Sequence, residues 1–324
     1  MHPIAFYQEA FIKHLEGKIV EKEPKNLYEP INYILGLGGK RLRPVLTLMS
    51  ADFFGGGFKN ALNAALAIEV FHNFSLVHDD IMDDAPIRRG QATVHEKWDI
   101  NTGILSGDAM LINSYQLFES YKSGSFHQLV ALFSKTAIEV CEGQQYDVDF
   151  ETRDDVTLLE YLKMIEFKTA VLVACALKMG AIVSGASAEN QNLIYEFGRN
   201  LGIAFQIQDD YLDAFGDPQT FGKQVGGDII ENKKTYLYLK ALEKSSKEER
   251  KQLSDLFSIQ PTDPSSKIEA VKEVFERTGA VEETANAIKA YTRKAFEALE
   301  TIDLPKEQKD VFVKFGEDLM QRAV

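Results

Sequence analysis

No proline occurs between Pro86 and Pro218, although the chain contains nine prolines in 324 residues. Proline is excluded from helix interiors because it lacks an N–H donor and its ring clashes with the preceding turn. A long proline-free stretch would be unusual in a strand-and-turn protein but suits a stack of long helices. Apolar spacing agrees, because Ile194, Phe197 and Leu201 recur at helical intervals. The sequence therefore predicts an all-α fold.

Chain length alone allows one domain or two. No change in composition marks a boundary, so we expect one domain over residues 1–324. No apolar run is long enough to cross a membrane. The N-terminal stretch lacks the basic start and apolar block of a secretory signal. The expected protein is cytoplasmic and has no stable membrane insertion.

The formal net charge of −13 argues against nucleic acid as a partner, because phosphate binding requires clustered positive charge. The two cysteines, Cys141 and Cys175, lie in apolar helical surroundings and show no CxxC spacing. We interpret both as buried structural thiols rather than metal or redox groups.

The first acidic patch is the stretch "VHDDIMDDAPIRRG" at residues 77–90, which places four aspartates within six positions before a pair of arginines. His72, Asp79 and Asp83 lie seven and four residues apart, so a helix would present all three on one face. Carboxylates at i and i+4 repel each other unless a cation joins them. The patch therefore predicts a cation site at the end of a helix.

The second acidic patch comprises Gln206, Asp209, Asp210 and Asp213, which share a helix face at i, i+3, i+4 and i+7. A single Asp-Asp-x-x-Asp patch is most often a solvated surface. Here two copies end strongly apolar helices and are followed by basic residues. Paired carboxylates of this kind form an all-oxygen site suited to Mg²⁺, which completes its shell with water and substrate phosphate.

The motifs occur in an order that resembles the trans-isoprenyl diphosphate synthases, also called polyprenyl synthetases. The resemblance covers roughly residues 36–236 and rests on "GGKRLRP", "HDDIMD" with "RRG", "KT", "FQIQDDYLD" and "GK" with "NKKT". It implies a single large helical bundle around a deep central cavity, and a homodimer. It also implies Mg²⁺-dependent head-to-tail condensation of isopentenyl diphosphate with an allylic diphosphate, with three ions once diphosphate is bound.

The resemblance also assigns roles to individual residues. The direct metal ligands would be Asp79, Asp83 and Asp209, with Asp80, Asp210 and Asp213 orienting them or binding through water. The allylic diphosphate would be held by Arg88, Lys168 and Lys223, with Lys233 close to the closed site. Isopentenyl diphosphate would be held by Lys40, Arg43, His72 and Arg89. Thr169 and Gln206 would face the developing cation, and the departing diphosphate would take the proton.

Several of these residues have simpler interpretations. Taken alone, His72 is more often a core histidine than a ligand contact, and Gln206 could satisfy a backbone group. Gln144 and Asp147 in "EGQQYD" suit either a polar cavity lining or a helix cap. We hypothesise that Arg88 serves the allylic diphosphate and Arg89 the isopentenyl one, because neighbouring residues point in different directions.

Product length should depend on the side chains that precede the first patch. A product chain running from Asp79 towards the N-terminus of its helix would meet Ser75, Phe74 and Phe71 in turn. Phe74, about 7.5 Å from Asp79 along the helix axis, would close the end of the space for the growing chain and so form its floor. Phe71 would form a second floor one turn further on. An aromatic residue at this position before an uninserted DDxxD resembles the geranylgeranyl-making members of the family. The resemblance therefore implies geranylgeranyl diphosphate as the product, with farnesyl diphosphate second and long chains not expected. Alternatively, Phe74 only packs against a neighbouring helix.

Three other functions share parts of the pattern. A terpene cyclase would carry an Asn/Asp, Ser/Thr, Glu triad where this chain has "DDYLD". A non-catalytic subunit of a prenyl synthase would lack one patch or its basic residues, and a metal-dependent phosphohydrolase would release phosphate without chain growth. The chain ends in "LMQRAV", with Arg322 as its one basic residue there, so closure is expected to rely on the glycine-containing segment 216–234.

Overall fold

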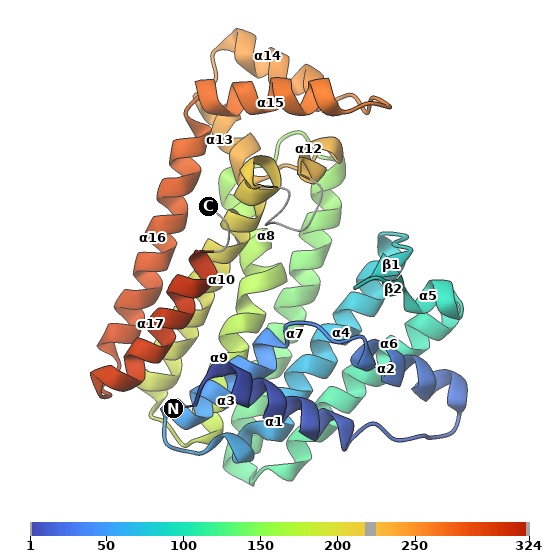
Figure 1. Ribbon diagram of the computed structural model, residues 1–324, viewed down its shortest axis with the longest axis vertical. Coiled ribbons are helices and arrows are strands. Elements are labelled where there is room, and N and C mark those ends of the chain that lie inside the picture. The colour runs from blue at the N-terminus through green and yellow to red at the C-terminus, as the bar shows by residue number, and fades with distance from the viewer. Residues whose placement is uncertain (1, 218–224, 322–324) are drawn as a thin grey trace. The chain divides into compact units, whose positions relative to one another are not determined.

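The computed structural model describes residues 2–217 and 225–321 and is almost entirely helical (Figure 1). This confirms the all-α prediction. Contacts divide the chain into two compact units. Unit 1 comprises residues 1–135 and 175–192, and unit 2 comprises residues 136–174 and 193–324. The single domain and its central cavity stay predictions.

Unit 1 is built around one long apolar helix, α4. Its other elements pack on α4 or on each other, and Figure 1 shows α6 running beside it. The elements are α1 (Ile4–Glu16), α2 (Lys25–Gly36), α3 (Leu42–Phe53), η1 (Phe58–Ala61), α4 (Leu62–Met82), β1 (Ile87–Arg88), β2 (Gln91–Ala92), α5 (Val94–Lys97), α6 (Ile100–Gln116), η2 (Leu117–Ser120) and the first part of α7 (Ser123–Thr152). Because α4 is apolar on most of its surface, neighbours cover it on several sides.

A short hairpin follows α4 and carries the arginine pair. Strands β1 and β2 are antiparallel, and Arg88 pairs with Gln91. The two turn residues, Arg89 and Gly90, have φ of 53° and 74°. Positive φ at both central residues is characteristic of the tight type I′ hairpin turn. The two arginines therefore lie on different parts of the hairpin, one in a strand and one in the turn.

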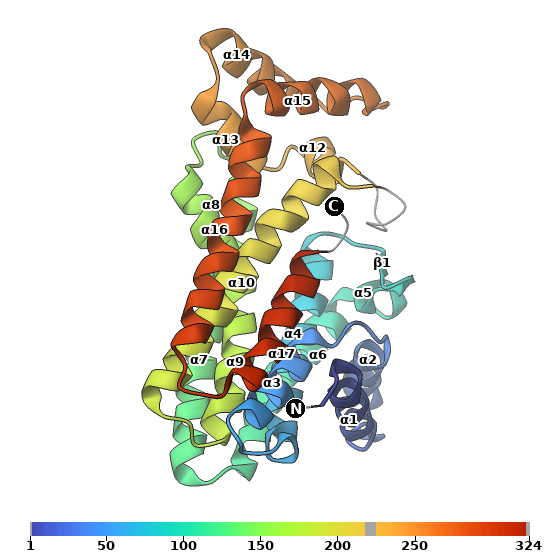
Figure 2. The ribbon, with the colours of Figure 1, turned by 60° about the vertical axis from the view of Figure 1, so that its left-hand side comes forward.

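Unit 2 contains the rest of α7 and the remaining helices. They are α8 (Leu158–Ile165), η3 (Glu166–Ala170), α9 (Val171–Val183), α10 (Ala188–Phe215), α12 (Gly227–Ile230), α13 (Tyr236–Lys244), α14 (Lys247–Leu256), α15 (Ser265–Arg277), α16 (Ala280–Thr301) and α17 (Lys306–Met320). Most of α9, residues 175–183, and the start of α10, residues 188–192, belong to unit 1. Helix α13 contacts α8, α14, α15 and α16, a meeting point that can be followed in Figure 2.

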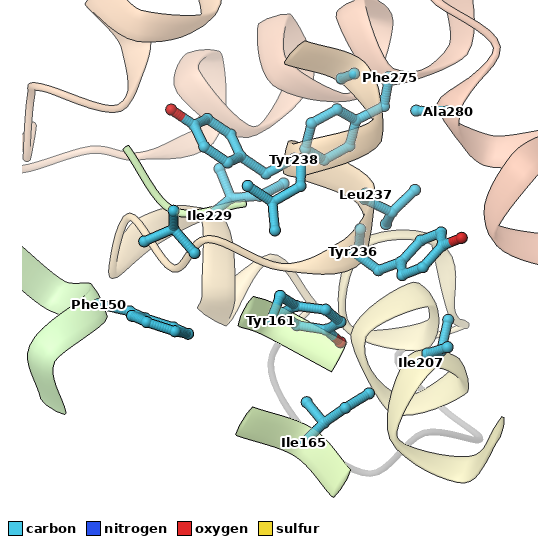
Figure 3. Packing of buried hydrophobic residues seen from close by; sticks show 14 of the residues in the cluster. Phe150, Tyr161, Ile165, Ile207, Ile229, Tyr236, Leu237, Tyr238, Phe275 and Ala280 are labelled. Atoms are coloured by element: carbon cyan, nitrogen blue, oxygen red, sulfur yellow. The ribbon is translucent and has the colours of Figure 1, made fainter. Parts of the chain in front are cut away.

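The core of unit 2 leads directly to polar residues. Figure 3 shows Tyr161 between Ile165 and Tyr236, with Ile207 of α10 nearby. Tyr161 is 2% exposed, so its ring is part of the core. Its hydroxyl nevertheless donates a hydrogen bond to Asp210. The apolar cluster therefore fixes the position of one carboxylate of the second acidic patch.

The two cysteines have different environments. Cys175 is buried as expected, but Cys141 is exposed, so the expectation of two buried thiols is wrong for Cys141. The physical reason is the local face of α7, because Ile138, one turn earlier, is also 56% exposed. None of the described helices is both long and apolar enough to cross a membrane.

Candidate active site

Asp80 anchors the hairpin at the end of α4. Its side chain is 1% exposed, and Arg88 Nε donates to both of its carboxylate oxygens at 2.7 and 2.8 Å. A second guanidinium nitrogen of Arg88 lies 2.6 Å from the same carboxylate. Burial lowers the pKa of Arg88, but the bonds to Asp80 outweigh it, so the pKa is raised. Such bidentate contacts fix orientation as well as charge.

Asp79 presents a carboxylate oxygen that lacks a partner. Its Oδ1 atom is buried and accepts no hydrogen bond, while its Oδ2 atom lies 3.9 Å from Arg88. An unpartnered buried carboxylate oxygen is costly unless a cation or donor is added. Asp83 follows one turn later as the exposed C-cap of α4. This pair therefore fits the divalent cation that the sequence predicts.

A basic cluster is formed by Arg43 of α3, His72 of α4 and Arg89 of the hairpin turn. Arg43 lies 3.1 Å from the His72 ring nitrogen, and Arg89 donates to the Gly38 carbonyl. Burial lowers the pKa of His72 well below its usual value, and Arg43 and Arg89 lower it further. Burial also lowers the pKa of Arg43 and of Arg89. A negatively charged group placed here would offset this accumulation of positive charge.

Arg41 lies next to this cluster in the chain, and its structural role was not predicted from the sequence. The residue has φ of 48°, and its guanidinium lies 2.5 Å from Glu69 and also donates to the Leu35 carbonyl. Both members of the pair are buried. Because Arg41 lies between Lys40 and Arg43, this ion pair fixes the start of α3 and the residues just before it, where the two predicted anion contacts lie. Breaking a buried pair is strongly destabilising.

The adjacent arginines have different partners, as the hypothesis of separate substrates requires. Arg88 contacts Asp80, whereas Arg89 reaches Gly38 and lies beside Gly39. Their individual substrates stay predictions. The exposed Lys40 lies on the same loop as Gly39.

Unit 2 contains a cavity of about 260 Å³ that collects most of the residues predicted for this part of the chain. It is lined by Lys168, Thr169, Gln206, Asp209, Asp210 and Lys233. Residues not in the predicted site, namely Asp147, Tyr161, Asp228 and Glu231, complete its polar wall. Lys223 and Arg322 lie outside the described residues.

A chain of hydrogen bonds connects the predicted cation-facing residues to the acidic patch. Thr169 donates to the Gln206 carbonyl at 3.3 Å, and the Gln206 amide donates to Asp210 at 3.3 Å. Tyr161 donates to the other Asp210 oxygen at 2.5 Å. Burial raises the pKa of Asp210 to about 7, and the charge of Asp228 contributes. The amide oxygen of Gln206 and the hydroxyl of Thr169 are thereby held in fixed orientations.

Asp228 adds a further carboxylate to this cavity. Burial and the charge of Asp213 raise its pKa to about 6. The Asp228 amide donates to the Asp213 carboxylate at 2.9 Å, so Asp213 fixes the start of α12. Lys233 lies 3.7 Å from Asp228 and 2.7 Å from Glu231. The two acidic residues of "GGDIIENKK" were the signal available in the sequence.

Lys168 is presented by an irregular turn and held by Asp147. Its ammonium group donates to Asp147 Oδ2 at 2.5 Å. Residues 166–170 form the single π-helical turn η3, a feature often found at functional sites. Of the two interpretations of Asp147, this contact supports the cavity lining.

Two glycines allow neighbouring helices to approach this turn. A Cβ atom on Gly143 of α7 would lie 2.2 Å from the Lys168 backbone nitrogen, and one on Gly202 of α10 would lie 2.8 Å from Ala170. Neither distance is possible for a real side chain without movement. Glycine is therefore required where α7 and α10 contact the turn that carries Lys168 and Thr169.

The two predicted floor residues pack within an aromatic cluster. Phe71 is 1% and Phe74 8% exposed, and their ring centroids are 5.4 Å apart. Phe71 also contacts Phe133 at 5.1 Å, while Phe74 lies 4.9 Å from the His78 ring. Aromatic neighbours therefore hold both phenylalanine rings in place. Their effect on product length stays a prediction.

The sequence matches the Polyprenyl synthetase family over residues 24–275. The short chain isoprenyl diphosphate synthase of Methanothermobacter thermautotrophicus is 38% identical over 298 residues, which cover 92% of this chain and 91% of that protein. The geranylgeranyl pyrophosphate synthase of Geoglobus acetivorans is 37% identical over 311 residues, covering 95% and 94%. A crystal structure of a geranylgeranyl pyrophosphate synthase matches with a TM-score of 0.95 at 54% identity, covering 100% of both chains.

The lowered pKa of His72 predicts a pH effect on stability. Below about pH 6.5, His72 binds a proton in the unfolded chain but stays neutral in the folded chain, so the free energy of unfolding falls as the pH drops. By pH 5.5 this costs up to about 1 kcal/mol. His72→Gln should remove that part of the loss in urea unfolding at pH 7.5 and 5.5. The exposed His127 provides the control, and His127→Gln should keep the full loss. Equal pH dependence in all three proteins would contradict this account.

The close contact at Gly143 predicts that a larger residue there will destabilise the fold. Gly143→Ala should destabilise the protein by about 1–3 kcal/mol, because its methyl group meets the backbone of Lys168. The matched control is Gly124→Ala on the same helix, where no atom lies within 4 Å of the added carbon. The control should be neutral or stabilising, because alanine favours a helix. Denaturant unfolding monitored by circular dichroism measures both, and two equal effects would be inconsistent with the close approach.

Proposed function

The chain belongs to the polyprenyl synthetase family, and from that premise we propose that it is a short-chain prenyltransferase. It condenses isopentenyl diphosphate head-to-tail with allylic diphosphates, and geranylgeranyl diphosphate is the product. The observation that carries this proposal is the basic cluster of unit 1. Burial and neighbouring arginines lower the pKa of Arg43, His72 and Arg89. A substrate diphosphate supplies the missing negative charge.

The cofactor in this proposal is Mg²⁺, held by Asp79 and Asp83 in unit 1 and by Asp209 in unit 2. The unpartnered Oδ1 atom of Asp79 supports this assignment, because a hard cation prefers carboxylate oxygen. When bound, Mg²⁺ neutralises the charge that develops on the leaving diphosphate. Asp80 does not ligate the ion directly in this account, since both of its oxygens accept from Arg88.

The cationic side chains bind and orient the two diphosphates. Arg88 of unit 1 and Lys168 of unit 2 are both diphosphate-binding residues in this proposal, and the contacts with Asp80 and Asp147 place each of them before substrate arrives. Fixed cations of this kind stabilise a leaving group as its charge grows, without reorganising during the reaction. Lys233 and Lys223 are further diphosphate-binding residues in this proposal.

The reaction breaks the allylic C–O bond and forms a carbon–carbon bond to the double bond of isopentenyl diphosphate. The positive charge that develops on the allylic carbon is faced by oxygen atoms of Thr169 and Gln206, which are linked by a hydrogen bond at 3.3 Å. The resulting cation then loses a proton to the departed diphosphate. No side chain is therefore required as a strong base.

The aromatic cluster before Asp79 determines product length in this proposal. The growing chain advances along α4 until it meets Phe74, which Phe71 supports from the next turn. Phe74 lies five residues before Asp79, or about 7.5 Å along the helix axis. The geranylgeranyl product follows from a single aromatic floor with the small Ser75 beside it. Farnesyl diphosphate is the shorter alternative.

We further propose that the chain forms a homodimer through α6. Helix α6 exposes Ile104, Leu105 and Ile112, at 41%, 59% and 59%. Clustered exposed apolar side chains on one helix are characteristic of protein interfaces, and a second copy of the same surface is the simplest partner. Light scattering of the purified chain measures the molar mass directly.

The metal role predicts the effect of removing Asp79. Asp79→Ala should lower turnover by ~10²–10³-fold or more, because stabilisation of the leaving group is lost. The fold should remain, since like charge is removed from the end of α4. The assay contains Mg²⁺, isopentenyl diphosphate and each of the three short allylic primers. Asp310→Ala, at an exposed aspartate of α17, is the control. Near-wild-type turnover of the Asp79 variant would exclude the metal role, and phosphate release without chain growth would identify a phosphohydrolase.

The floor predicts a change of product. Phe74→Ala should lengthen the product by at least one isoprene unit, and Phe74→Ala with Phe71→Ala should lengthen it further. Chromatography of the dephosphorylated products measures the chain length. Phe126→Ala on α7 is the control and should keep the wild-type product. A folded, active double variant that makes the wild-type product would place the floor elsewhere.

A further inference from the structure

Asp84, His95 and Glu96 of unit 1 form a cluster that the proposed reaction does not use. Each offers a ligand atom, and the three atoms all lie within 4.8 Å of one another. Asp84 follows the end of α4, whereas His95 and Glu96 lie on α5. The hairpin with Arg88 and Arg89 separates these two positions in the sequence.

His95 provides independent support for a ligand at this cluster. Its side chain is only 4% exposed, yet neither ring nitrogen makes a hydrogen bond. Its Nε2 atom lies 3.9 Å from the Glu96 carboxylate, so one of these nitrogens faces the cluster. Buried polar atoms are almost always paired, and an exception commonly indicates a missing water or ion.

We propose that Asp84, His95 and Glu96 bind a zinc-class divalent ion. One imidazole nitrogen and two carboxylates are suitable ligands for Zn²⁺, which accepts both donor types and can take water in the fourth position. Mg²⁺ prefers oxygen ligands alone and is therefore a poor match. Asp84 and Glu96 are exposed, so their side chains are free to rotate towards the ion from the separations in the structure.

This ion occupies a different place from the proposed Mg²⁺ ligands. Among the described residues, the cluster consists of Asp84, His95 and Glu96 and does not include the carboxylates of Asp79 and Asp83. An ion on the new site ties the end of α4 to α5 and closes the loop that contains the hairpin. Its effect is therefore to hold the two ends of the arginine-bearing segment together. Because the ion binds the folded chain, it also raises the melting temperature.

The test uses the full chain without a purification tag, stripped with a chelator and dialysed against ZnCl₂ in excess MgCl₂. We expect one Zn²⁺ per chain that Mg²⁺ does not displace, and a rise in melting temperature. Co²⁺ in place of Zn²⁺ should give visible d–d absorption bands, and His95→Gln should change their position or intensity. Glu96→Gln and His95→Gln should each weaken binding at least tenfold and remove the thermal shift.

Matched controls distinguish this site from others. Glu119→Gln and His127→Gln change exposed residues of the same types in unit 1 and should bind as the wild type does. Asp79→Ala should also keep the ion. If His95→Gln fails to fold, Glu96→Gln and Asp84→Asn carry the test, because both side chains are exposed. Unchanged Zn²⁺ binding in the cluster variants, displacement by Mg²⁺, or loss of the ion in Asp79→Ala would overturn the proposal.

Discussion

Repulsion between like charges is the constraint to which both units respond. In unit 1, positive charge gathers around His72, and burial together with the surrounding arginines lowers its pKa. In unit 2, burial and the charge of neighbouring carboxylates raise the pKa of Asp210 to about 7 and that of Asp228 to about 6. Each arrangement costs folding free energy that a ligand of opposite charge would return. A prenyltransferase has such ligands in its diphosphate substrates and its metal ions.

The charged groups are kept in place by ion pairs that are buried or half-buried. Asp80 holds Arg88, Glu69 holds Arg41, and Asp147 holds Lys168. In each pair one partner belongs to a helix, while the other lies on a hairpin, a loop or an irregular turn. The helices therefore provide rigid reference points for segments that would otherwise have few constraints. Preorganised charges stabilise a developing charge more effectively than mobile ones, because no reorganisation is needed during the reaction.

The sequence predicted the parts that depend on periodicity and composition. The absence of proline and the apolar spacing were sufficient for the helical class, and the spacing of the second acidic patch was sufficient to group Gln206, Asp209 and Asp210, which line the unit 2 cavity. Other cavity residues, among them Lys168, Thr169 and Lys233, were expected only from the family resemblance. Residue types that act through three-dimensional approach were missed. Gly143 gives no chemical signal in the sequence, because its importance comes from the backbone nitrogen of Lys168, which lies 25 positions further along the chain. Only the packing of the helices brings "EGQQYD" and "FKT" together. The exposure of Cys141 likewise depends on which face of α7 neighbours cover.

The same reasoning explains why an irregular turn lies in the middle of unit 2. The core requires Ile165 at the end of α8 and Ala170 at the end of η3 to be buried. Successive residues of an α-helix differ in direction by about 100°, so a regular helix has little freedom to turn a polar pair towards the cavity without moving these apolar faces. The π-helical turn adds one residue to the turn and changes the register locally. Lys168 and Thr169 can then both line the cavity, and the absence of side chains at the two facing glycines leaves room for the wider turn.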